Sequence, residues 1–332
     1  MAEWSKVSEV EENPELIWSD KQRRILSEGK HFKVQVGQDA PHIQAQDWYR
    51  GDHINFWPSK TNLSESNAVY DYLLKGFVPE APFIKKTDHI TAFGSCFAHY
   101  IRIRLNELGY PTYLPTQKQL PIVHMPEGLN TTFALVQQFE WAWENKYVPE
   151  GLWLDAEKNY FTPTEDTRLE TRQIFDSTNV FILTIGLSEI WFDKNTSEVF
   201  WRGVPLDKFD SSKHGFRVST VDENVANLRK ICFLIRKYRP DATIILTLSP
   251  VPLFATFRDI PCTAASSVSK AILRTAIDVV YQEYKADGNF FYWPAYEIVK
   301  EFNNSYDLDN RHVSEDTRTI ILENFEKYFL LP

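Results

Sequence analysis

One cysteine of the sequence stands where a nucleophile would be activated. The stretch 91–108 reads TAFGSCFAHYIRIRLNEL, in which Gly94, Ser95 and Cys96 join a short apolar run to a helical pattern. The N–H groups and the positive dipole at the start of a helix favour a thiolate and can bind an oxyanion. A glycine at such a turn permits the sharp bend. The competing interpretation is a small buried cysteine in a capped turn.

An aspartate and a histidine lie three residues apart in the stretch 306–316, YDLDNRHVSED. On a loop before a final helix, the Asp309 carboxylate can hold one nitrogen of the His312 imidazole while the other nitrogen takes a proton from a nucleophile. The same stretch predicts that Ser314 caps the last helix, which is compatible with the first reading. Together with Cys96, the pair predicts a Cys-His-Asp triad.

Alternating strand and helix patterns would position these residues. Apolar runs at 90–93, 180–186, 243–252 and 289–296 predict strands, and helical periodicity is found at 97–108, 131–143, 221–238, 269–284 and 314–329. Because the runs are apolar on both sides, they are typical of a parallel sheet with both faces covered. The alternation predicts an open α/β sheet whose functional residues follow the carboxyl ends of strands.

The chain divides, by its patterns, into a mixed first part and a regular second part. We expect residues 1–88 to form an N-terminal extension packed on the main domain, and residues 89–332 to form that domain. The stretch 114–176, which is broken by prolines and rich in tryptophan, is predicted to be an insertion with its own helix.

Composition excludes several classes of function. With 36 basic and 45 acidic residues the formal charge is -9, which disfavours nucleic acid as a partner. The sequence has no apolar run long enough for a membrane span and no apolar leader, so we expect a soluble, cytoplasmic protein. The three cysteines show no zinc spacing and no disulfide framework, so no metal is predicted. The oligomeric state is left open.

Several motifs carry a resemblance to a known family. They are FGSCFAHYI (93–101), TIGLSEIW (184–191), LTLSPVP (246–252), SKAILR (269–274), FYWPAYE (291–297) and DNRHVSE (309–315). Over about residues 89–330 the chain resembles the GSCFA family, which is similar to the SGNH/GDSL hydrolases. The resemblance implies an α/β fold, a flavodoxin-like three-layer α/β/α sandwich with a mostly parallel sheet, and the chemistry of esterases and acyltransferases.

The resemblance also assigns the ends of the site. Phe93 to Cys96 fall on the superfamily's first block, FGDS, so Cys96 takes the place of the nucleophilic serine and Ser95 that of the aspartate. Asp309 and His312 fall on its last block, DxxH. If the loop is shifted by one position, Ser95 is the alternative nucleophile.

The oxyanion-binding part departs from the superfamily. Gly186, Ser188 and Glu189 fall on the third block, GxND, and Ser188 replaces the asparagine that normally donates to the oxyanion. Asn130, in GLNTTF, can supply an amide instead, or it can be a helix N-cap.

The implied chemistry is acyl transfer in two steps, without a cofactor, on an acyl ester. The family resemblance to enzymes that modify polysaccharides points to an acylated carbohydrate, with acyl-coenzyme A as one candidate acyl donor. A thioester intermediate favours transfer over hydrolysis. Two other functions remain open: a non-catalytic carbohydrate-binding or assembly protein that retains the fold, and a cysteine-based redox sensor.

Three further residues are interpreted as structural. Lys270 and Arg274, four apart on one helix, are expected to be solvated basic residues. Cys232 lies on an apolar helical stripe and is expected in the core.

Overall fold

The structure of the protein is a computed structural model that describes residues 17–19, 24–26, 55, 57–58, 62–114, 120–124, 129–146, 163–201, 203–301 and 305–332. The chain divides into two compact units, Met1–Leu73 and Leu74–Pro332. In the first unit, β1 (Ile17–Ser19) pairs antiparallel with β2 (Arg24–Leu26). A 3-10 turn (Asn62–Ser64) and a π-helical turn (Tyr70–Leu74) follow.

The second unit is built on a four-stranded parallel sheet. Its strands are β3 (Ile90–Gly94), β4 (Val180–Ile185), β7 (Thr243–Leu248) and β8 (Phe290–Tyr292), in that spatial order. The register aligns Phe93 with Leu183 and Leu183 with Leu246. Every residue of β3, β4 and β7 is buried, as expected for strands covered on both faces. The predicted parallel sheet is confirmed.

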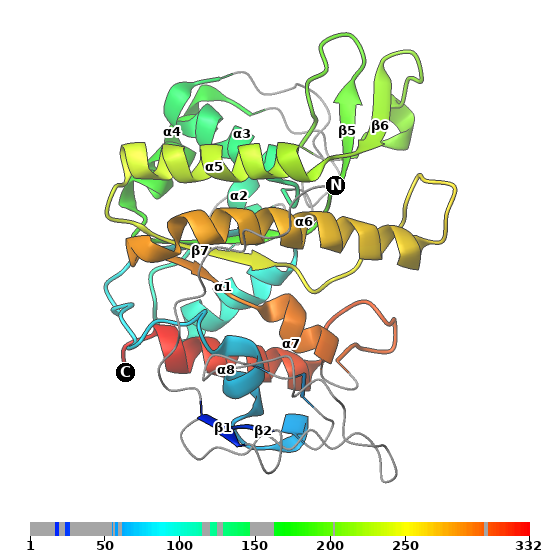
Figure 1. Ribbon diagram of the computed structural model, residues 1–332. Coiled ribbons are helices and arrows are strands. Elements are labelled where there is room, and N and C mark those ends of the chain that lie inside the picture. The colour runs from blue at the N-terminus through cyan, green and yellow to red at the C-terminus, as the bar shows by residue number, and fades with distance from the viewer. Residues whose placement is uncertain are drawn as a thin grey trace. The chain divides into compact units, whose positions relative to one another are not determined.

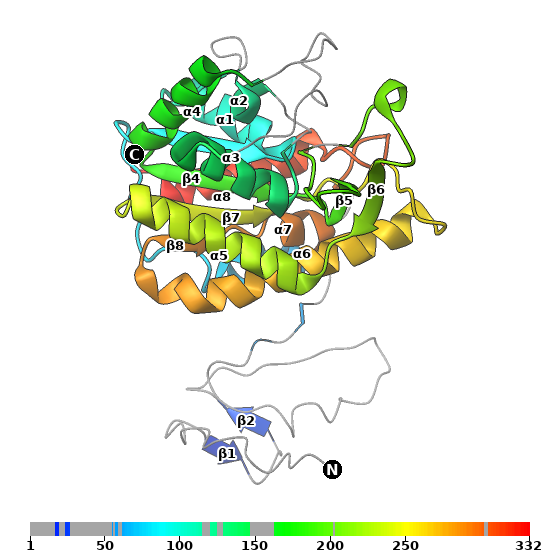
Figure 2. The same ribbon diagram turned by 90° about the horizontal axis from the view of Figure 1, so that it is seen from above.

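Helices cover both faces of this sheet, which makes the three layers of an α/β/α sandwich (Figure 1). On one face lie α3 (Thr132–Glu144), α5 (Val221–Tyr238) and α6 (Cys262–Tyr284). On the other lie α1 (Phe97–Glu107), α7 (Ala295–Glu301) and α8 (Glu315–Phe329). Figure 2 shows α5 and α6 side by side, drawn below β4 and β7 in that view. Helix α6 begins at Cys262, directly after Pro261, and not at Ser269 as the periodicity indicated.

Within the described part of the stretch 114–176, the helices are α2 (Pro121–His124), α3 and α4 (Glu165–Ser177), the last of which ends one residue beyond it. Phe139 of α3 stacks on Phe175 of α4, with ring centroids 4.7 Å apart, and lies 5.7 Å from Phe93 of β3. Helix α3 therefore belongs to the layer that covers the sheet. The predicted division into an extension, a domain and an insertion stays a prediction.

An antiparallel hairpin that the sequence patterns did not predict follows β4. It consists of β5 (Glu189–Asp193) and β6 (His214–Val218), and the short turns Leu206–Lys208 and Lys285–Asp287 complete the elements. Among the described helices, none combines the length and the apolar character that crossing a lipid bilayer requires.

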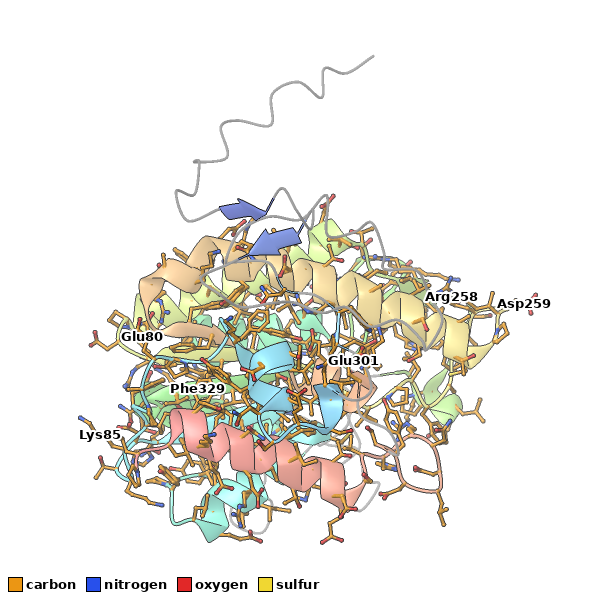
Figure 3. The ribbon with its side chains drawn as sticks, turned by 60° about the horizontal axis from the view of Figure 1, so that its bottom comes forward. Glu80, Lys85, Arg258, Asp259, Glu301 and Phe329 are labelled. Atoms are coloured by element: carbon orange, nitrogen blue, oxygen red, sulfur yellow. The ribbon has the colours of Figure 1, made fainter. Side chains whose placement is uncertain are left out.

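Different segments lie at the two ends of the strands. Figure 3 labels Arg258 and Asp259, on the loop after β7, on the opposite side of the view from Lys85, which precedes β3. Phe329, at the end of α8, is fully buried, and its carbonyl accepts hydrogen bonds from the N–H groups of Phe83 and Ile84. The loops after the strands are therefore the ones that can hold a site, as parallel α/β sheets require.

Candidate active site

The turn between β3 and α1 depends on Gly94. Its φ of +126° lies where side chains are strongly disfavoured, and a Cβ atom there would lie 2.0 Å from the Thr184 carbonyl oxygen. The neighbouring strand thus approaches the backbone of the turn more closely than any side chain would allow. The glycine predicted to shape the turn is required at this position.

Ser95 and Cys96 complete the turn in different ways. The Ser95 N–H donates to both the Thr184 hydroxyl (2.6 Å) and its carbonyl (3.0 Å). The Ser95 hydroxyl, in turn, accepts from the N–H of Phe97 at 3.2 Å, so it caps the first turn of α1. Ser95 is buried, whereas Cys96, the N-cap residue of α1, is partly exposed. Of the two candidate nucleophiles, Cys96 is the accessible one.

Asn130 lies beside this turn. Its carbonyl accepts from the N–H groups of Gly186 (2.7 Å) and Leu187 (3.1 Å), directly after β4. A Cβ at Gly186 would lie 3.3 Å from the Asn130 Cβ and 3.5 Å from the Ser95 Cβ. The helix N-cap reading of Asn130 is wrong, because Thr131 caps α3 through its hydroxyl. Four predicted positions, Gly94, Ser95, Asn130 and Gly186, therefore meet at the carboxyl ends of β3 and β4.

Asp309 and His312 also meet. The Asp309 carboxylate is hydrogen-bonded to Nδ1 of His312, and it accepts from the backbone N–H groups of Arg311 (3.0 Å) and His312 (2.9 Å). These bonds, led by the backbone N–H of His312, lower the pKa of Asp309 to about 2. Asn310 supports the loop in a left-handed conformation (φ +54°), and Ser314 caps α8 as predicted. The carboxylate thus fixes the imidazole at one nitrogen.

The second nitrogen of His312 faces a cation. Nη1 of Arg311 lies 3.4 Å from Nε2 of His312, and Nε of Arg311 donates to the Pro252 carbonyl at 3.2 Å. The guanidinium also lies over the ring of Phe254, 5.4 Å from its centroid. Phe254 is 84% exposed and presents a flat apolar surface next to the candidate base.

Backbone carbonyls after β7 hold the site together. Lys270 donates to the carbonyl of Ser249 (2.7 Å), Tyr306 to that of Pro250 (3.2 Å) and Arg311 to that of Pro252. The segment Ser249 to Pro252 therefore anchors the Asp309–His312 loop.

Lys270 is the main residue that the sequence interpretation missed. Its side chain is buried and not solvated, with 3% of its surface exposed. Nζ donates to the carbonyls of Gly186 (3.1 Å) and Ser249, and burial lowers the pKa of Lys270 to about 7. Electrostatic interaction with Cys96 opposes this shift, and Arg311 adds to it. The sequence did contain a sign of this burial: Lys270 lies three residues before Leu273, on the same buried face of α6.

Ser188 and Glu189 lie deeper. Ser188 is fully buried, and its hydroxyl oxygen has no hydrogen-bond partner among the described residues. Its backbone N–H donates to the Ser269 hydroxyl at 2.9 Å. Glu189 accepts from the Thr256 hydroxyl at 2.8 Å, and burial raises its pKa. Neither contact by itself supports a role as oxyanion donor.

The remaining predicted structural residues behave unevenly. Cys232 is fully buried, as expected, and burial raises the pKa of its thiol to about 12. Arg274 is partly buried and forms ion pairs with Glu297 (2.6 Å) and Asp278 (3.2 Å). All three cysteines are free thiols. The redox-sensor reading gains no support from them.

Comparisons with known proteins agree with the motifs. Residues 89–325 match the model of the GSCFA family. No curated protein matches the sequence significantly.

Several solved structures match the fold. A carbohydrate esterase family 3 from Talaromyces cellulolyticus is 9% identical, with 73% of this chain and 94% of that chain covered and a TM-score of 0.35. The Clostridium thermocellum family 3 carbohydrate esterase is 14% identical, with 73% and 94% covered and a TM-score of 0.35. A GDSL-like lipase from Bacteroides thetaiotaomicron is 12% identical, with 72% and 85% covered and a TM-score of 0.37. The match to a putative platelet activating factor from Streptococcus pneumonia covers only 60% of that protein's chain.

Proposed function

The chain belongs to the GSCFA family, and from that membership and the site's geometry we propose that it is an acyl-transfer enzyme, an esterase or O-acyltransferase. Cys96 is the nucleophile, His312 the general base and Asp309 the residue that orients the base. The observation that carries the proposal is the Asp309–His312 pair, held on a loop whose anchor is the carboxyl end of β7.

The contacts of His312 favour the protonation state that a base requires. A guanidinium has only N–H donors, so Nε2 beside Arg311 is an acceptor with its lone pair in place. The proton then lies on Nδ1, where it is shared with Asp309. A neutral imidazole with its acceptor lone pair at Nε2 is the form that takes a proton from a thiol.

The reaction follows in two steps. His312 Nε2 takes the Cys96 proton, the sulfur attacks the acyl carbon, and the negative charge moves to the carbonyl oxygen. The backbone N–H of Cys96 and the side-chain amide of Asn130 donate to this oxyanion. The leaving oxygen takes the proton from His312, and a thioester on Cys96 remains. Water or an acceptor hydroxyl, deprotonated by His312, then releases the acyl group and restores the thiol.

An acylated carbohydrate is the proposed substrate. A sugar ring presents C–H groups that pack on aromatic faces, and Phe254 offers such a face beside Arg311. Whether water or a sugar hydroxyl is the acceptor decides between hydrolysis and transfer. Because a thioester reacts readily with alcohols, transfer to a carbohydrate is the form of the reaction we favour.

Steady-state assays of wild type, Cys96→Ala and His312→Ala test the mechanism against acyl esters, acetylated sugars and acyl-coenzyme A. We expect turnover to fall by about 10³-fold or more in both variants. Cys262→Ala is the control, because Cys262 lies at the start of α6 and should leave turnover unchanged. Full activity in Cys96→Ala and His312→Ala would remove the mechanism.

Mass spectrometry separates the proposal from its alternatives. After an activated ester is added, the acyl group should be found on the Cys96 peptide. An adduct on Ser95 instead would make that residue the nucleophile. Absence of any adduct, together with retained binding of carbohydrates, would favour the non-catalytic binding protein.

A further inference from the structure

We infer that Lys270 is a positioning residue for the nucleophile: its side-chain nitrogen, buried beside the turn that carries Cys96, stabilises the Cys96 thiolate. The inference deepens the proposed function, since it takes Cys96 as the nucleophile. It assigns a role to a buried cation that the triad chemistry does not use.

Two backbone carbonyls, each directly after a strand of the sheet, hold the Lys270 nitrogen. Nζ donates to the carbonyls that follow β4 and β7, those of Gly186 (3.1 Å) and Ser249 (2.7 Å). The α-carbon of Gly186 lies against Ser95, because a Cβ on it would be 3.5 Å from the Ser95 Cβ. One of the two residues that Nζ binds, Gly186, therefore lies next to the turn that carries Ser95 and Cys96.

The charged form of Lys270 lacks a counter-ion. A neutral amine has two N–H groups, which suit the two carbonyls, and an ammonium has a third. Among the described residues, no carboxylate lies within 4.0 Å of Nζ to balance the charge. A buried ammonium without a counter-ion is strongly disfavoured. An anion at Cys96 would offset that cost.

The charges around Lys270 support this pairing. Burial lowers its pKa to about 7, Cys96 acts in the opposite direction, and Arg311 repels a second positive charge. Coupling between two titrating groups is reciprocal, so an ammonium that gains from the thiolate stabilises the thiolate equally. Protons should therefore leave the thiol and the ammonium as a coupled pair.

Alkylation of Cys96 measures this coupling without any substrate. The rate of reaction with iodoacetamide, followed on the Cys96 peptide by mass spectrometry, reports the thiolate fraction across the pH range. We expect Lys270→Met to move the inflection to higher pH by at least about one unit, so that the rate near pH 6.5 falls about tenfold. Lys270→Arg, which keeps the charge, should restore part of the rate.

Two controls accompany this experiment. Lys285→Met makes the same substitution at the exposed C-terminal end of α6 and should leave the profile unchanged. Cys262 serves as an internal reference in every variant. An identical Cys96 profile in wild type and Lys270→Met, with both folded by circular dichroism, would overturn the inference.

A second measurement covers the case in which Lys270→Met does not fold. The pKa of Lys270, followed by NMR of its side-chain nitrogen, should fall when Cys96→Ala removes the thiolate. No change would again overturn the inference. Neither measurement depends on turnover. If no ester in the assays is turned over, the proposed function fails but the inference about Lys270 is still tested. If turnover is normal and the Cys96 alkylation profile is the same in wild type and Lys270→Met, the inference fails and the proposed function stands.

Discussion

Nη1 of Arg311 lies 3.4 Å from Nε2 of His312, the nitrogen that would receive the proton of the nucleophile. The same guanidinium is held by the Pro252 carbonyl and by the ring of Phe254. A donor-only group at this place favours the Nδ1–H form of the imidazole, in which the proton lies toward Asp309. In the proposed mechanism, substrate or the Cys96 thiol would compete with Arg311 for Nε2.

Asp309→Asn tests the orientation of the base. Asparagine keeps an oxygen for the backbone N–H groups of Arg311 and His312, but it favours the wrong tautomer of the imidazole. We expect kcat on acyl esters to fall by about 10²- to 10⁴-fold with little change in KM. Asp307→Asn, in the same loop, is the matched control and should stay near wild type. Equal loss in both variants would point to loop damage.

Gly94→Ala tests the turn itself. The new methyl group would meet the Thr184 carbonyl at 2.0 Å, in addition to an unfavourable φ of +126°. We expect a loss of more than about 3 kcal/mol in the free energy of unfolding, measured by urea denaturation. Gly109→Ala is the control, because Gly109 has φ +77° but nothing within 4 Å. It should cost only about 1 kcal/mol, and similar losses at both sites would contradict the close approach.

Asn130→Asp and Ser188→Ala separate the two candidate oxyanion donors. Aspartate has the shape of asparagine without an N–H donor, and the Asn130 carbonyl keeps its bonds to Gly186 and Leu187. We expect kcat to fall by about 10²- to 10³-fold in Asn130→Asp. Ser188→Ala removes a buried hydroxyl that has no partner among the described residues, so stability should stay the same or rise by about 1 kcal/mol. If kcat fell in Ser188→Ala and stayed near wild type in Asn130→Asp, Ser188 would be the oxyanion donor.

Glu189→Gln tests a buried carboxyl against pH. Burial raises the pKa of Glu189, so its contribution to stability is present below its ordinary value of 4.5 and is lost as the pH rises. Glutamine keeps the acceptor for Thr256. We therefore expect the variant to gain stability over wild type as the pH rises from about 4 to about 7, measured by urea unfolding.

Glu223→Gln should show the opposite sign. Hydrogen bonds from Arg217 lower the pKa of Glu223, so its contribution is present above 4.5 and lost as the pH falls. Relative to wild type, this variant should be least stable near neutral pH. If both variants followed the same trend, the burial of Glu189 would not be the cause.

The sequence predicted the central sheet because its strands are apolar on both sides. Val180–Ile185 and Thr243–Leu248 contain hardly any polar residue, and only a strand buried on both faces has that pattern. The hairpin of β5 and β6 was missed, because EIWFD and HGFRV are short and only partly buried. Their pairing also joins segments separated by a long loop, which local patterns do not reveal.

The site was predictable where local sequence determines it. The Asp309–His312 pair forms within four residues, and Gly94 forms a local turn. Lys270 was misread, since its burial depends on carbonyls 84 and 21 residues away in the sequence. Asn130 remained ambiguous for the same reason: its neighbour Gly186 follows β4, far along the sequence. Contacts of this kind follow from the fold and not from residue type.

The order of the site along the chain has a consequence for synthesis on the ribosome. The last strand of the sheet ends at Tyr292, whereas Asp309 and His312 follow it and attach to carbonyls after β7. All four strands of the sheet, together with Cys96 and Lys270, therefore emerge from the ribosome before Asp309 and His312 do. On this order, the loop of residues 306–313, which carries the proposed base, would be the last part of the site to dock.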